Sequence, residues 1–121
     1  MKRIFIALAL ALAISPVVSA NNNVQMYGAG GNKCSSFVVA ATAERSGESY
    51  VIDSYLSWAA GWSSLLSTQQ NADVLNGIDG PTLKFELELY CRTFPERYFA
   101  NAVVNLLARI ATGELQPAPP L

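Results

Sequence analysis

Residues 49–68 have the sequence SYVIDSYLSWAAGWSSLLST. Large apolar side chains recur there in steps of four, three, four and three, which places them on one face of an α-helix. These side chains are Val51, Tyr55, Trp58, Trp62 and Leu65. Further apolar residues at positions 52, 56, 59 and 66 widen the face. Since so broad an apolar face must be covered by other elements, the segment predicts the central helix of a small all-α bundle.

Helical spacing also predicts one helix before this segment and two after it. The first begins at Cys34, has Asn32 as its N-cap and stops at Gly47. The third begins at Pro81, because a proline lacks the N–H that stays unpaired in a first turn anyway. Its predicted buried side consists of Leu83, Leu87, Tyr90, Cys91 and Phe94.

The fourth helix is predicted to open with a capping box, since Thr93 precedes Glu96 by three positions, and to end at Gly113. The sequence FELEL at 85–89 alternates as a strand would, but helical spacing continues around it, so a strand is the alternative there. We therefore expect a four-helix domain at 34–113. A flexible, Gly-rich arm at 21–33 precedes it, and an extended, Pro-rich tail at 114–121 follows it.

The first twenty residues predict a secretory signal peptide. A basic start (Met1, Lys2, Arg3) leads into an apolar run at 4–14, and small residues at 18–20 come just before polar Asn21. The alternative is an uncleaved membrane anchor, but an apolar run of this length spans only about half of a ~30 Å hydrocarbon core. We expect a soluble, exported protein in a bacterial periplasm.

The chain has two cysteines, Cys34 and Cys91, which lie 57 positions apart. In an oxidising compartment an even number of cysteines in a small domain predicts a disulfide. Closing a loop of this length contributes about 4 kcal/mol in the chain-entropy model. Two buried free thiols are the alternative, and the Cys-x-x-Cys spacing of redox-active pairs is absent.

Composition excludes several classes of function. The chain of 121 residues has no histidine, so it lacks the commonest general base and the commonest metal ligand. Without Lys2 and Arg3 of the signal, six Lys and Arg face nine Asp and Glu, and a net charge of −3 does not suit a nucleic-acid binder. Glu44 and Glu48 lie one turn apart, but no nucleophile motif accompanies them. We therefore expect no catalytic residues, no metal and no cofactor.

Binding to another protein is the remaining expectation. Tyr55, Trp58 and Trp62 form an aromatic line that is either core or an anchor for a partner. Two stripes of small residues, at 36, 40, 43 and 47 and at 57, 61, 64 and 68, predict that the first two helices pack against each other; alternatively, one stripe lines a groove for a partner.

Two families share parts of this layout. The signal peptide, the sequences NKCSSF (32–37) and YCRTFP (90–95), and the aromatic second helix resemble the small periplasmic Hde acid-stress chaperones. The sequence WAAGW (58–62), followed by 83–107 with a proline before the last helix, is similar to periplasmic immunity proteins that neutralise type VI secretion effectors. An unassigned exported family that shares only the fold is a third possibility.

The Hde resemblance implies a disulfide-stapled helical protein that is dimeric at neutral pH and exposes apolar surface to client proteins in acid. The immunity-protein resemblance implies tight binding to one toxin. We accordingly expect a non-enzymatic, exported protein-binding domain, with acid-stress chaperoning as its most concrete form and toxin immunity as the alternative.

Overall fold

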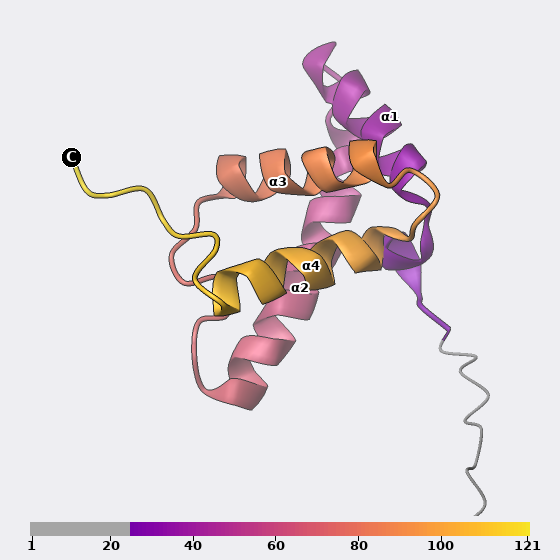
Figure 1. Cartoon of the computed structure of the whole chain (residues 1–121). Coiled ribbons are helices and arrows are strands. Elements are labelled where there is room, and N and C mark those ends of the chain that lie inside the picture. Colours follow the sequence, from indigo (N-terminus) through magenta and orange to yellow (C-terminus); the bar gives the residue numbers. More distant parts are fainter. Residues whose placement is uncertain (1–24) are drawn as a thin grey trace, which may run out of the picture.

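A computed structural model describes residues 25–121 of the chain. The predicted signal peptide and residues 21–24 of the predicted arm lie outside the described residues. In chain order the elements are the 3₁₀ helix η1 (Gly28–Gly31), α1 (Cys34–Arg45), α2 (Tyr50–Gln70), α3 (Gly80–Thr93) and α4 (Phe99–Ala111) (Figure 1). The prediction of an all-α fold with four helices is confirmed, and positions 85–89 belong to α3 rather than to a strand.

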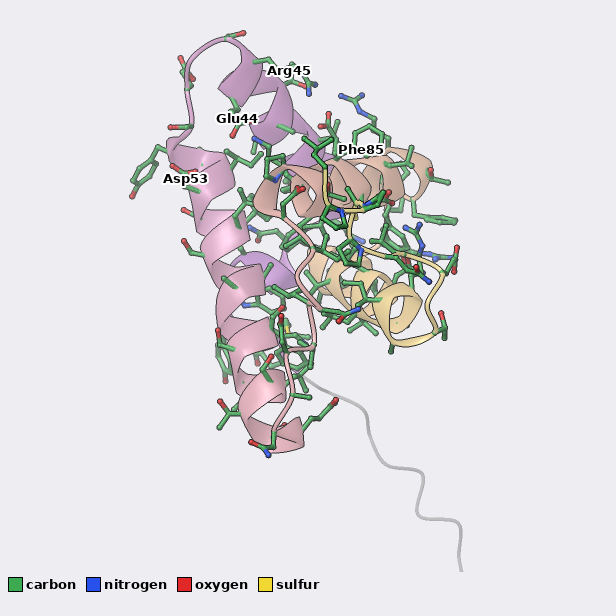
Figure 2. All side chains as sticks on the ribbon, turned by 90° about the vertical axis from the view of Figure 1, so that its left-hand side faces the viewer. Glu44, Arg45, Asp53 and Phe85 are labelled. Atoms are coloured by element: carbon green, nitrogen blue, oxygen red, sulfur yellow. A yellow bond between two sulfur atoms is a disulfide. The ribbon has the colours of Figure 1, made fainter. Side chains whose placement is uncertain are left out.

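The helices pack as two hairpins. In Figure 1, α3 and α4 lie side by side and α2 crosses behind them; in Figure 2, α2 runs along one edge of the molecule with α3 and α4 on one side of it. The turn from α1 into α2 passes through Gly47, whose φ of +95° suits a residue without a side chain. As Figure 2 shows, the other helices cover α2 from one side only.

An aromatic cluster at the centre of the core joins three of the helices. Phe37 of α1, Tyr55 of α2 and Phe99 of α4 have ring centroids 4.7–5.3 Å apart. All three side chains are buried, as are Ile52 and Leu87 next to them in the same core. The second helix is therefore not the central helix that its apolar spacing predicted: Tyr55 and Ile52 are buried in the core, but Val51 and Leu65 of the same predicted face are 51 % and 52 % exposed.

The disulfide is confirmed. Cys34 at the start of α1 is bonded to Cys91 near the end of α3, with Cα atoms 4.7 Å apart. Both sulfurs lie in the fully buried core. The bond therefore ties together two helices that are distant in sequence.

The helix starts differ from the prediction because distant backbone groups cap them. Lys33, not Asn32, is the N-cap of α1, and the N–H groups of Cys34 and Ser35 donate to the carbonyls of Arg97 and Pro95. Asn32 instead donates from its side chain to the Tyr55 hydroxyl, 3.2 Å away. The loop between α3 and α4 thus takes the place of a side-chain cap.

The predicted capping box at 93–96 is wrong. Thr93 is the last residue of α3, and α4 begins only at Phe99. The Tyr98 N–H there donates to the Asn101 side chain at 3.1 Å. Pro95 lies in the loop, and a proline cannot continue a helix from the preceding turn.

The predicted packing along the small-residue stripes is also wrong for the second helix. All four of its stripe positions (57, 61, 64 and 68) are exposed. A Cβ added to Gly61 would meet nothing within 4 Å. This stripe lies on the side of α2 that no other described helix covers.

Within the described residues, no helix is both long enough and apolar enough to cross a membrane.

Candidate functional site

The aromatic line, predicted as either core or a partner anchor, is largely part of the folded interior. Tyr55 is 3 % exposed and belongs to the central cluster. Trp58 is covered by η1: its indole N–H donates to the Tyr27 carbonyl at 2.9 Å, and a Cβ on Gly30 would overlap its ring. The C-terminal end of the predicted flexible arm is thus packed on α2. Gly30 allows this contact because it has no side chain.

Trp62 continues the line from the core to its edge. Its ring stacks on that of Trp58 with centroids 5.8 Å apart and planes 9° apart. The Trp62 indole N–H is buried and has no hydrogen-bond partner among residues 25–121. Of the three residues, Tyr55 and Trp58 contribute to the fold, and only Trp62 lies at its edge.

A different apolar surface faces outward on α3. Phe85 and Leu89 lie one turn apart and are 62 % and 50 % exposed. We call this pair the outer ridge of α3. Figure 2 shows Phe85 standing out from α3 on the side where Arg45 of α1 lies. The sequence contained a signal for it, since the alternation in FELEL at 85–89 puts an apolar residue on each side of the helix.

Two shallow hollows flank the outer ridge, and Leu89 borders both. The hollow toward α1 has a volume of about 310 Å³ and is lined by Arg45, Phe85, Glu88, Leu89 and Arg92. The hollow toward α4 has a volume of about 280 Å³. Its lining is formed by Glu86, Leu89, Tyr90, Thr93, Phe94, Arg97, Asn105 and Arg109. Phe94, predicted to be buried, is 37 % exposed here.

Ion pairs form the walls of these hollows. Glu88 accepts from Arg45 at 2.9 Å and from Arg92 at 2.7 Å. Partial burial raises the pKa of the Glu88 carboxyl, but hydrogen bonds and charge from the two arginines outweigh burial and hold the pKa below its ordinary value. On the other side Arg109 donates to Glu86 at 2.6 Å, and this hydrogen bond raises the pKa of Arg109.

Arg97 differs from these arginines in its partners. It is the one arginine within residues 25–121 that forms no ion pair with a carboxylate. Its guanidinium lies 3.8 Å from the centroid of the Phe94 ring and donates to the Tyr90 hydroxyl at 2.9 Å. Aromatic contacts therefore hold the cation in place while its charge remains available to an anion.

A third cavity lies between α2, α3 and α4 and is almost wholly apolar. Its volume is about 200 Å³. The lining includes Leu56, Leu83, Leu87, Val103 and Leu106. In this apolar groove Leu83 and Leu87 of α3 form one wall, and Val103 and Leu106 of α4 form another.

The carboxylates form no centre of their own in the described part of the chain, where no group of three or more Cys, Asp or Glu could hold a metal. Glu44, considered from the sequence beside Glu48, is instead paired with Lys84 of α3. What the geometry offers is two kinds of apolar surface: an exposed ridge with charged walls, and a groove behind α3.

In comparisons with known proteins, the chain matches no family model, no curated protein and no solved structure.

Proposed function

We propose that this chain is an exported, non-enzymatic protein-binding domain that loosens in acid and then binds apolar segments of other proteins, as an acid-stress chaperone of the periplasm does. One observation carries the proposal: every ion pair between two helices of the described structure has one partner on α3. Glu44 of α1 pairs with Lys84, Glu88 with Arg45 of α1, and Glu86 with Arg109 of α4.

Acid acts on all of these attachments together. Protonation removes the negative charge of the three glutamates that hold α3 to its neighbours. Without its signal peptide, the chain would change from a net charge of −3 to one of +6, because nine carboxyl groups lose their charge and six basic groups keep theirs. Loss of ion pairs and mutual repulsion both favour an expanded state with exposed apolar surface.

The disulfide limits how far the structure can open. Cys91 stays bonded to Cys34, so the C-terminal end of α3 remains attached to α1 when the ion pairs are gone. The N-terminal part of α3, which contains Leu83 and Leu87, is then free to move away from Val103 and Leu106 of α4. These two residues form the other wall of the groove. Acid would thus open the apolar groove without complete unfolding.

The proposal is tested by the fluorescence of an apolar dye and by the aggregation of an acid-sensitive client protein, each between about pH 7 and pH 2. We expect dye binding and suppression of aggregation to appear together as pH falls. The triple variant Glu44→Gln, Glu86→Gln, Glu88→Gln should bind dye at a higher pH than the parent. The matched control replaces Glu48, Asp53 and Glu96, which form no ion pair in the described structure, and should follow the parent. No gain of dye binding in acid would refute the proposal.

Toxin immunity is the second candidate, and the outer ridge of α3 favours it. Phe85 and Leu89 are exposed without any acid-induced change, as a surface for one specific partner at neutral pH would be. A pull-down from periplasmic extract separates the two functions. One tight, stoichiometric partner at pH 7 supports immunity, whereas many weak partners that bind only in acid support the chaperone.

A further inference from the structure

We propose that the outer ridge of α3 and its two hollows bind an acidic, amphipathic helix of a partner protein at neutral pH. The inference rests on the proposed function only in taking the chain as a protein-binding domain. It assigns to the protein a second surface, distinct from the apolar groove behind α3, and a partner of defined chemistry.

The apolar part of this surface has the dimensions of a helix-binding site. Phe85, Leu89 and Phe94 follow one another along α3 and its C-terminal end, and α3 with its 14 residues is about 21 Å long. Leu89 separates the two hollows, each of which is large enough for an apolar side chain. A partner helix with apolar residues one turn apart would place one side chain on each side of Leu89.

The charges lining the hollows select an acidic partner. Four arginines line them, Arg45, Arg92, Arg97 and Arg109, against the two carboxylates Glu86 and Glu88 and a third, Glu114, which pairs with Arg109. The surface therefore carries a local charge of +1, although the chain without its signal carries −3. Carboxylates beside an apolar stripe would complement it, whereas a basic helix would be repelled.

Arg97 supplies the most specific part of the argument. The other three arginines already donate to glutamates, but Arg97 has no carboxylate partner among the described residues. Phe94 and Tyr90 hold its guanidinium at the border of the second hollow. An arginine that is held in place and has no carboxylate partner can donate two hydrogen bonds to a carboxylate at a small cost in side-chain entropy.

The test uses synthetic peptides at pH 7 rather than in acid, where the proposed chaperone function would act. One peptide of about 18 residues has a leucine stripe flanked by glutamates, and the matched peptide has the same leucines flanked by lysines. We expect the acidic peptide to bind, to bind at least tenfold more tightly than the basic one, and to bind less tightly as salt is raised. Isothermal titration gives the affinities, and amide chemical-shift changes should map to α3 and the loop after it.

Variants locate the site. Leu89→Ser and Arg97→Gln should each weaken binding of the acidic peptide by about tenfold, because Leu89 borders both hollows and arginines are among the residues that dominate such interfaces. Arg97→Lys should restore only part of the affinity, since lysine keeps the charge but not the planar fork. The control Leu65→Ser removes a leucine of similar exposure from α2 and should bind as the parent does. Circular dichroism of each variant verifies the fold.

Three outcomes would overturn the inference: equal affinity for the acidic and basic peptides, unchanged affinity in Leu89→Ser, or tight binding to vesicles of anionic phospholipid with no binding to the acidic peptide. The last outcome would assign the surface to a membrane. Each result is independent of the acid-induced dye binding that tests the chaperone function, because these measurements are made at neutral pH.

Discussion

At the scale of single residues, the glycines Gly61 and Gly30 lie in opposite environments. Gly61 lies inside the long helix α2, and the sequence suggests that close packing requires it there. The structure places it in open space, with nothing near its missing side chain. Gly30, within the segment expected to be a flexible arm, instead lies against the indole of Trp58. Of these two residues, Gly30 is therefore the one that packing requires to be glycine.

Two alanine substitutions test this contrast. Gly30→Ala should lower the free energy of unfolding by about 1–3 kcal/mol, because the new methyl group would displace the Trp58 ring. Gly61→Ala should raise it by about 0.5–1 kcal/mol, because alanine is the better residue in an exposed helix. Urea unfolding monitored by tryptophan fluorescence measures both. A destabilising Gly61→Ala would mean that the outer side of α2 is covered.

At the scale of elements, α3 is the helix through which charge acts on the fold. Its Glu86 and Glu88 and its Lys84 connect it to both neighbouring helices. The start of α3 depends on a local charge as well, since the Asp79 carboxylate accepts from the Thr82 N–H at 2.7 Å. This hydrogen bond, with that of the Thr82 side chain, holds the pKa of Asp79 below its ordinary value. A helix attached by carboxylates is sensitive to acid.

Glu88→Gln measures that sensitivity. At pH 7 the variant should unfold with a free energy lower by about 0.5–1 kcal/mol, the range for ion pairs near a surface. Because the pKa of Glu88 is lower in the folded chain than in the unfolded one, its contribution is complete above the unfolded value of about 4.3 and is lost as pH falls through the folded value. The difference in the free energy of unfolding between Glu88→Gln and the parent should therefore become smaller below about pH 4. Urea midpoints at pH 7, 4 and 2 measure it, with Asp53→Asn as the unpaired control; a constant difference at all three pH values would contradict it.

At the scale of the whole molecule, one junction joins the start of α1 to the end of α3 and the start of α4. The disulfide joins α1 to α3, and the carbonyls of the loop after α3 cap the first turn of α1 beside it. The N–H of Phe99 at the start of α4 donates back to the Asn32 carbonyl at 2.8 Å. Three helices therefore meet at Cys34, and the covalent bond fixes their common point.

Removing the disulfide should lower the free energy of unfolding more than any of the substitutions described above. Reduction, or the double variant Cys34→Ala, Cys91→Ala, should lower the free energy of unfolding by about 4 kcal/mol, because the unfolded chain regains the entropy of a loop of 57 residues. The urea midpoint of the reduced and oxidised parent measures the change. Adding reductant to the double variant is the control and should have no effect. An unchanged midpoint in the parent would contradict the prediction.

The candidate site was less accessible from the sequence than the fold was. Helical spacing identified Tyr55, Trp58 and Trp62 as apolar positions but could not show that the chain at 28–31 folds back over Trp58. It also assigned Phe94 to the buried side of its helix, although the helix ends one residue earlier and leaves this ring at the surface. The exposure of a side chain depends on which segments pack against it. Contacts with segments distant in sequence produce no periodic pattern around the residue itself.

The sequence by itself determined the all-α class, the four helices and, through two cysteines in a small chain predicted to be exported, the disulfide. Those features follow from spacing within one segment or from the chemistry of a single pair. Only the tertiary structure decided which side of α2 is covered, which backbone groups cap α1, and that Phe85 and Leu89 remain outside. The physical reason is that periodicity defines an apolar side of each helix, whereas burial of that side depends on how the helices cross and on how much surface each can cover.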